Sequence, residues 1–235
     1  MIKLFNDDCF DVMSKIPDHS INMILADLPY GTTKNKWDIA LPLNTLWKEY
    51  KRLLAPKGVV ALFGDEPFSS ALRQSNKSWY RYDWYWIKGG APTGFLNAHR
   101  MPMKKVETIS IFYPKLPLYN PQMTKGKTYS TTTGSHTKNY GKFHNITIKD
   151  RDYRYPVNVL SFKKVAGKTN HPTEKPVELL QYLIKTYTND GVTILDNTMG
   201  SGSTGVAANK LNRNFIGIEL EKKYFEIAKK RIDEA

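Results

Sequence analysis

The chain has 235 residues, a length that suits one sizeable domain or a core with an insertion. Its 35 Lys and Arg residues against 22 Asp and Glu residues give a formal net charge of +13, which points to a polyanionic partner. No apolar run approaches the roughly 18 residues of a membrane span, and acidic residues interrupt the N-terminal segment where a secretion signal would be apolar. The single Cys and five scattered His residues exclude an intrachain disulfide and show no zinc-ligand spacing.

The first 113 residues alternate short apolar runs with amphipathic stretches, which predicts strands and helices exchanging in an α/β sheet. Asp8 or Asp11 is expected to cap a short helix, and Pro56 with Gly58 is expected to end a longer one. The expected strands are 2–5, 22–26, 59–63, 84–87 and 108–113, and the expected helices after the capped one are 43–54 and 67–73.

Residues 114–156 differ in composition from the rest of the chain. They are polar, rich in Thr, Tyr and Lys, and show no sustained hydrophobic period. Eight Lys and Arg residues face two Asp residues there, a net charge of +6. A long structureless segment within a compact domain is usually functional, so we interpret this stretch as an insertion that contacts a partner.

Regular patterning returns with Pro176, which is expected at the first position of a helix reaching about Tyr187. A β-loop-α-β unit follows, with a strand at 192–195, a glycine loop at 196–202, a helix at 203–211, a strand at 215–218 and a last helix at 221–232.

The glycine loop carries the first chemical signal. Gly200, Gly202 and Gly205 match G-x-G-x-x-G between a predicted strand and a predicted helix, where glycines allow a ligand to approach the backbone. Glu219 ends the next strand, where a carboxylate accepts hydrogen bonds from a ribose. Asp196 would repel the diphosphate of NAD and attract a cationic sulfonium, which favours S-adenosylmethionine. A tight turn without a ligand is the alternative on the glycines alone.

Two further segments contain residues suited to binding or catalysis. Asp27-Leu28-Pro29-Tyr30 follows a predicted strand and combines a carboxylate, a rigid turn with backbone carbonyls and an aromatic ring, which together suit a planar base. Residues 170–176 lead into a helix, whose free N–H groups attract anions. An ordinary turn with a packed Tyr and a plain capped helix start are the respective alternatives.

Together these segments resemble a known family. Asp27-Leu28-Pro29-Tyr30, His171-Pro172-Thr173-Glu174-Lys175-Pro176 and the stretch 196–204 look like motifs of the amino-methylating DNA methyltransferases, and their order resembles the β-class permutation. The resemblance implies a circularly permuted, Rossmann-like α/β sheet and S-adenosylmethionine as methyl donor. It also implies double-stranded DNA as partner, with residues 1–113 as the catalytic half, 114–156 as a basic target-recognition insertion and 157–235 as the cofactor-binding half.

The resemblance assigns a role to individual residues. Asp27 resembles the catalytic carboxylate, Pro29 the backbone-carbonyl position, with the carbonyl of Leu28 as the alternative acceptor, and Tyr30 the stacking aromatic. Leu28 departs from the usual first Pro of this motif, and Asn197-Thr198-Met199 replaces a Pro-Phe-containing loop. The implied cofactor-binding residues are Asp8, Cys9, His171, Thr173, Lys175, Pro176, Asp196, Met199, Gly200, Ser201, Gly202, Thr204 and Glu219.

DNA contacts are expected mainly from basic residues, which neutralise phosphates, and from amides, which read base edges. The candidates are Lys34, Arg100, Lys125, Lys127, Lys138, Asn139, Lys142 and Arg151. Any one of them is equally well explained as a solvated surface residue. No metal ligand is predicted, and Cys9 is interpreted as a small packed residue rather than a nucleophile for cytosine C5.

Several functions remain open from the sequence. The leading hypothesis is transfer to adenine N6 with base flipping, because Asp as the first motif residue favours adenine by resemblance. Cytosine N4 or an RNA amine would use the same chemistry. An NAD-dependent oxidoreductase and a non-catalytic nucleic-acid-binding module are the alternatives from other classes. The resemblance further suggests a cytoplasmic enzyme of a bacterial or phage-infected cell, a homodimer in some relatives, and a cognate restriction endonuclease as a partner.

Overall fold

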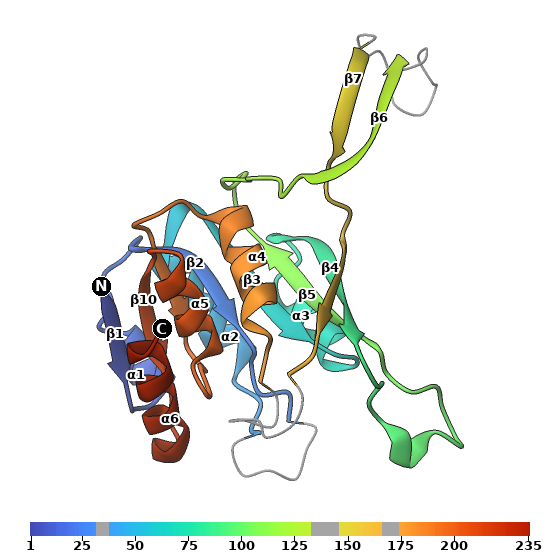
Figure 1. Cartoon of the computed structure of the whole chain (residues 1–235). Coiled ribbons are helices and arrows are strands. Elements are labelled where there is room, and N and C mark those ends of the chain that lie inside the picture. The colour runs from blue at the N-terminus through green and yellow to red at the C-terminus, as the bar shows by residue number, and fades with distance from the viewer. Residues whose placement is uncertain (32–37, 133–145, 166–173) are drawn as a thin grey trace. The chain divides into compact units, whose positions relative to one another are not determined.

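A computed structural model describes residues 1–31, 38–132, 146–165 and 174–235 (Figure 1). The chain divides into two units, one formed by residues 1–120 and 158–235 and the other by 121–157. The strands of the first unit are β1 (Ile2–Phe5), β2 (Ile21–Ala26), β3 (Leu54–Gly64), β4 (Tyr80–Gly89), β5 (Val106–Phe112), β8 (Val159–Lys163), β9 (Thr193–Asp196) and β10 (Asn214–Ile218). Its helices are α1 (Cys9–Met13), α2 (Leu43–Leu53), α3 (Phe68–Ser75), α4 (Val177–Tyr187), α5 (Ser203–Lys210) and α6 (Lys222–Asp233), with a short 3₁₀ turn, η1, at Phe95–Asn97.

The strands of the first unit form one sheet in the order β1-β10-β9-β2-β3-β5-β4-β8. β5 runs antiparallel to both of its neighbours, and every other pair is parallel. The carboxyl ends of all strands except β5 therefore meet at one edge of the sheet. In open α/β sheets this edge is where ligands bind.

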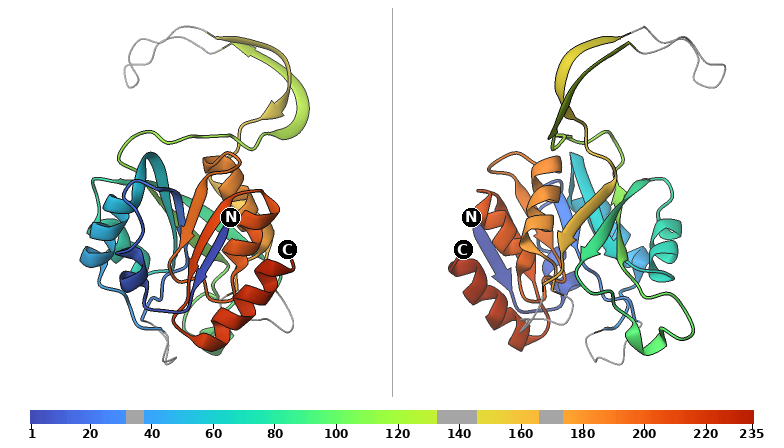
Figure 2. Two further views of the ribbon diagram at one scale, coloured as in Figure 1. Left: turned by 90° about the vertical axis from the view of Figure 1, so that its left-hand side faces the viewer. Right: turned by 45° about the vertical axis from the view of Figure 1, so that its right-hand side comes forward.

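Helices cover both faces of this sheet (Figure 2). Alternate residues of β2 face opposite sides: Met23 and Leu25 pack with the apolar residues of α4, α5 and α6, whereas Ile24 and Ala26 pack with those of α1, α2 and α3. This alternation follows from the two-residue period of a strand, and a strand buried on both faces needs apolar residues throughout. The predicted α/β sheet is confirmed.

Several element ends follow the expected local chemistry. The Asp8 side chain caps α1 by accepting hydrogen bonds from the backbone N–H groups of Phe10 and Asp11, at 2.8 and 3.4 Å. Pro176, expected as the first helical residue, is instead the extended N-cap of α4, so the helix begins one residue later than predicted, at Val177.

The boundary between α2 and β3 was predicted wrongly. β3 begins at Leu54, directly after α2, so Pro56 and Gly58 lie within the strand instead of ending the helix. The pairing of β2 with β3 shifts register between Ile21 and Met23, and the extra residues of β3 are accommodated at this irregularity.

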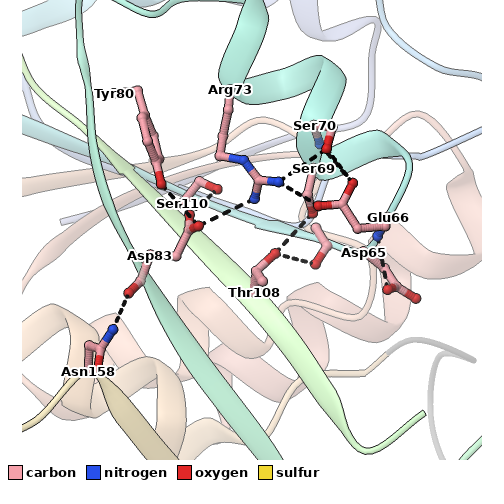
Figure 3. A network of polar contacts seen from close by, with 11 residues as sticks. Asp65, Glu66, Ser69, Ser70, Arg73, Tyr80, Asp83, Thr108, Ser110 and Asn158 are labelled. Atoms are coloured by element: carbon pink, nitrogen blue, oxygen red, sulfur yellow. Dashed lines mark hydrogen bonds and ion pairs between the residues drawn. The ribbon is translucent and has the colours of Figure 1, made fainter. Parts of the chain in front are cut away.

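A buried polar cluster joins α3 to β4 and β5 (Figure 3). One carboxylate oxygen of Asp83 accepts a hydrogen bond from Ser110 at 2.6 Å, and the other accepts from Tyr80 at 3.1 Å and from Arg73 at 3.3 Å. Arg73 also pairs with Glu66 at 2.5 Å. Because each carboxylate oxygen has donors, Asp83 is tolerated beside the apolar core.

The second unit contains two antiparallel strands, β6 (Thr124–Thr132) and β7 (Thr147–Arg154). The sequence showed no period here, and most side chains of both strands are exposed, so no alternation of apolar and polar residues is required. Arg154 lies 3.9 Å from the ring centre of Tyr129 and Arg151 lies 5.0 Å from that of Tyr153. These contacts hold basic and aromatic groups together on a two-stranded ribbon.

Candidate active site

A cavity of about 650 Å³ opens at the carboxyl edge of the sheet, a volume typical of small-molecule sites. It brings together most of the residues predicted from the two main motifs. The predicted residues in its wall are Asp8, Cys9, Asp27, Leu28, Pro29, Tyr30, Lys175, Asp196, Met199, Gly200, Ser201, Thr204 and Glu219. Residues 27–30 and 196–204, far apart in the sequence, therefore border the same space.

The turn after β2 orients its carboxylate and its aromatic ring toward each other. Tyr30 Oη donates a hydrogen bond to Asp27 Oδ1 at 2.7 Å. The Tyr30 ring stacks on Phe68 of α3, with ring centres 4.8 Å apart and planes inclined by 22°. Leu28 is buried among the apolar residues that α1, α2 and α3 contribute, which explains how this position tolerates Leu in place of Pro.

Asp27 is the first member of a chain of four charged side chains that alternate in sign. Lys175 Nζ forms an ion pair with Asp27 Oδ2 and lies 3.0 Å from Glu107 Oε1. Glu107 Oε2 in turn lies 2.8 Å from Lys88 Nζ. The Lys175 and Glu107 side chains are only 10% and 8% exposed, so solvent screens their attraction weakly.

Burial and this charge chain shift the three pKa values in different directions. Burial raises the pKa of Asp27 above its ordinary value, although Lys175 opposes the shift. Burial would also raise the pKa of Glu107, but Lys175 and Lys88 more than offset it and the pKa lies below its usual range. Burial would lower the pKa of Lys175, and the two carboxylates outweigh it and raise that pKa. Lys175 therefore stays cationic beside Asp27.

The glycine loop is joined to the turn of residues 27–30 by a hydrogen bond, in which Thr198 Oγ1 donates to the backbone carbonyl of Asp27 at 3.1 Å. Asp196 Oδ1 accepts from the Thr198 backbone N–H at 3.1 Å, and burial raises the pKa of Asp196 to about 7. Gly202 has a φ of +79°, and a Cβ there would lie 2.8 Å from Ala228 Cβ, so both backbone shape and space require glycine.

The remaining wall of the cavity is acidic on one side and apolar on another. Glu219 accepts backbone hydrogen bonds from Gly200 at 2.9 Å and from Glu221 at 2.8 Å. Met199 is buried, and a Cβ at Gly217 would lie 2.4 Å from its sulfur, so glycine at that position makes room for this apolar wall.

Burial raises the pKa of the Cys9 thiol to about 11, which keeps it protonated and a poor nucleophile.

Some predicted residues lie elsewhere. Gly202 and Pro176 are outside the cavity wall and act as the N-caps of α5 and α4. Arg100 is exposed in the β4–β5 loop, while Lys125, Lys127 and Arg151 belong to the second unit. His171, Thr173, Lys34, Lys138, Asn139 and Lys142 lie outside the described residues.

Among the charged residues of the cavity wall that the sequence did not predict, Glu107 and Lys88 belong to the charge chain at Asp27. Neither belongs to a recognised motif. A signal did exist, because Glu107 adjoins a strongly apolar predicted strand and Lys88 directly follows another, and charges at strand ends often line a site. Their pairing across β4 and β5 depended on a register that the sequence does not reveal.

These features suit S-adenosylmethionine. Asp8, Asp196 and Glu219 offer carboxylates to a cation and to ribose hydroxyls, and Met199 offers an apolar wall to an adenine ring. A doubly covered α/β sheet with such a cavity beside a carboxylate and a stacked Tyr fits the class of S-adenosylmethionine-dependent methyltransferases.

Comparison with known proteins narrows this class. The family model N6_N4_Mtase, described as a DNA methylase, matches residues 21–230. The chain therefore belongs to the N6/N4 DNA methylases, the β-class DNA amino-methyltransferases, which depend on S-adenosylmethionine.

Individual relatives agree with this assignment. The chain is 29% identical to the type II methyltransferase M.HinfI of Haemophilus influenzae, over 98% of this chain and 68% of that protein. A shorter stretch, 30% of the chain, is 52% identical to 26% of the type II methyltransferase M2.DpnII of Streptococcus pneumoniae.

Solved structures show the same likeness. The crystal structure of the M1.HpyAVI–SAM complex has a TM-score of 0.67 and 26% identity, covering 99% of this chain and all of that one. The cytosine-N4-specific PvuII DNA methyltransferase, 16% identical with a TM-score of 0.70, shares the fold over 98% of this chain and 86% of its own.

Among the described helices, none has the length and apolar character needed to cross a lipid bilayer.

Proposed function

We propose that this DNA methyltransferase transfers a methyl group to the exocyclic N6 of adenine in duplex DNA after flipping the base out of the helix. The observation that carries the proposal is the meeting of Asp27 and Tyr30 with the glycine loop in one cavity, joined by the hydrogen bond from Thr198 to the Asp27 carbonyl. A methyl donor in the loop and an amine at the turn would thus be neighbours.

Base flipping follows from where the reacting atom lies. The amino nitrogen of a stacked base is unreachable from a cavity in the protein, so the base must leave the duplex at a cost of a few kcal/mol. Tyr30 offers an aromatic face in the cavity wall, and its stacking on Phe68 and its hydrogen bond to Asp27 fix the ring in place. Stacking of the extruded base on this ring offsets part of the cost.

Asp27 and a backbone carbonyl of Leu28 or Pro29 are assigned to the amine. An exocyclic amine is a weak nucleophile because its lone pair is delocalised into the ring. Acceptors for both amino hydrogens localise the lone pair and aim it at the methyl group, so positioning and charge stabilisation supply the rate. The attraction of Lys175 favours the ionised form of Asp27, which is the form that accepts hydrogen bonds and then a proton.

The bound S-adenosylmethionine supplies an electrophilic methyl group on a sulfonium. Asp196, Glu219 and Asp8 are assigned to hold it, with Met199 as the apolar wall. Adenine is preferred over cytosine because the first residue of the catalytic motif is Asp, which by resemblance is commoner in adenine enzymes. Cytosine N4 is the second candidate, since the turn geometry serves either amine.

The second unit is assigned to DNA recognition. Lys125, Lys127 and Arg151 lie on its two strands and would neutralise phosphates. A homodimer, a cognate endonuclease and the permuted motif order stay predictions from the resemblance.

The test uses labelled S-adenosylmethionine and unmethylated duplex DNA of complex sequence, followed by nucleoside mass spectrometry. N6-methyladenine is the expected product, and N4-methylcytosine would move the proposal to the second base. The Asp27→Ala variant should lose transfer by several orders of magnitude yet bind S-adenosylmethionine in calorimetry with unchanged affinity. Turnover that survives in this variant would refute the role of Asp27.

A further inference from the structure

The loop of residues 90–105, here called the β4–β5 loop, lies at the mouth of the cavity. It leaves the carboxyl end of β4 and enters β5 at the same edge of the sheet as the turn of residues 27–30 (Figure 1). Thr93 of the loop and Lys88 at its base line the cavity. Lys104 Nζ pairs with Asp65 Oδ2 at 2.5 Å, and Asp65 is itself part of the cavity wall.

The tip of this loop is held by its own hydrogen bonds. Thr93 and Lys104 exchange two backbone hydrogen bonds of 2.9 Å, which close the stem. Within the tip, the backbone N–H groups of Arg100 and Met101 donate to the carbonyl of Asn97 at 2.8 and 3.0 Å. The 3₁₀ turn η1 therefore has a defined shape although it extends from the sheet.

This tip presents apolar side chains to solvent. Phe95 and Leu96, adjacent in η1, are 73% and 75% exposed, and Met101 and Met103 beside them are also exposed. Apolar side chains gathered on one protruding turn usually contact a partner, because leaving them in water forfeits their burial.

Charge indicates which partner the tip contacts. Residues 90–105 include Arg100, Lys104 and Lys105 and contain no Asp or Glu. A basic loop with an apolar tip matches the surface of DNA, where phosphates border stacked bases. Side chains such as Phe and Leu enter base steps and unstack them in proteins that deform the duplex.

We propose that the β4–β5 loop is a wedge that inserts Phe95 and Leu96 into duplex DNA at the step beside the target base and so stabilises the flipped state. The inference rests on the proposed base flipping. The apolar pair fills the space vacated in the stack, Arg100 and Lys105 neutralise the flanking phosphates, and the cavity beside the loop receives the base.

The experiment compares the full chain with the double variant Phe95→Ala/Leu96→Ala. Leu116→Ala is the matched control, because Leu116 is equally exposed, at 76%, and lies outside both the loop and the cavity wall. The substrates are two unmethylated duplexes that contain the sequence the enzyme methylates, one fully paired and one with an abasic position opposite the target, where no base pair has to be broken.

On the paired duplex, kcat/KM of the double variant should fall about ten-fold or more, whereas on the abasic duplex it should return to within about three-fold of the wild type. S-adenosylmethionine affinity and the control variant should be unchanged. Equal losses on the two duplexes, no loss on either, or an oligomeric state that differs between the wild type and the double variant would overturn the wedge.

Failure of the proposed base flipping would give a different result from failure of the wedge. A wild-type protein that binds the paired and abasic duplexes with the same affinity would argue against base flipping itself. If only the wedge is wrong, the wild type still binds the abasic duplex more tightly than the paired one, and the double variant has the same kcat/KM as the wild type on both duplexes.

Discussion

Replacing Lys175 by Gln removes the cation buried between Asp27 and Glu107. At 3.0 Å and an effective dielectric constant near 20, the attraction of Lys175 for Glu107 alone is about 5 kcal/mol before desolvation is counted. Breaking a buried ion pair by removing one partner costs about 3–5 kcal/mol, because the other charge is left uncompensated. We expect a loss of this size in the free energy of unfolding of Lys175→Gln at pH 8.

The loss should depend on pH with a definite sign. Without Lys175, burial and mutual repulsion raise the pKa values of both carboxyls in the folded state above those in the unfolded state. The folded variant then binds more protons than the unfolded chain, so its stability falls as pH rises above the ordinary carboxyl range. The difference from the wild type should be smaller at pH 5 than at pH 8, and the acid limb of the single-turnover rate should move to higher pH.

Urea unfolding at both pH values and single-turnover methylation at saturating cofactor and DNA measure these effects. Lys88→Gln is the matched control, because Lys88 contacts the far oxygen of Glu107 and not the Asp27 carboxylate, so both effects should be smaller. Suppose that the free energy of unfolding of Lys175→Gln falls by less than about 1 kcal/mol at both pH values, and that the acid limb of its rate profile does not shift. Lys175 would then not sustain the charge of Asp27.

Two further predictions concern Asp196 and Tyr187. Because burial raises the pKa of Asp196 to about 7, S-adenosylmethionine should bind several-fold more tightly at pH 8 than at pH 6, and calorimetry of Asp196→Asn should show weaker binding without that increment. Tyr187→Phe leaves the indole N–H of Trp84, now donated at 2.7 Å, without its acceptor, so urea unfolding should show a loss of about 1–3 kcal/mol while methylation stays unchanged.

Local chemistry made much of the fold predictable. The Asp8 cap, the apolar strand ending at Ala26 and the glycine loop before α5 each depend on residues close together in the sequence, and the structure has them where they were expected. The structure brings the segments of the predicted motifs to one cavity, because the carboxyl ends of parallel strands meet at one edge.

Features set by distant residues were not predictable in this way. β8 was not predicted, because the strand is only five residues long and most of its side chains are exposed. β6 and β7 have no buried face that would impose a hydrophobic period on the sequence. The ion pair of Lys175 with Glu107 needs the segment just before α4 to lie against β5. In the sequence, Lys175 lies within a motif that by resemblance binds the cofactor, so no ion pair with Glu107 was expected.

The strand order also has a consequence for how the protein folds. β1, formed by the first residues, pairs with β10, formed near residue 218, and β9 lies between β10 and β2. Pairings between such distant segments carry a large loop-closure entropy and slow the search for the native sheet. During synthesis the edge of β2 that later receives β9 is without its partner, so a nascent chain lacking the last quarter has a carboxylate turn but no adjoining glycine loop. Methyl transfer is therefore available only to the completed sheet.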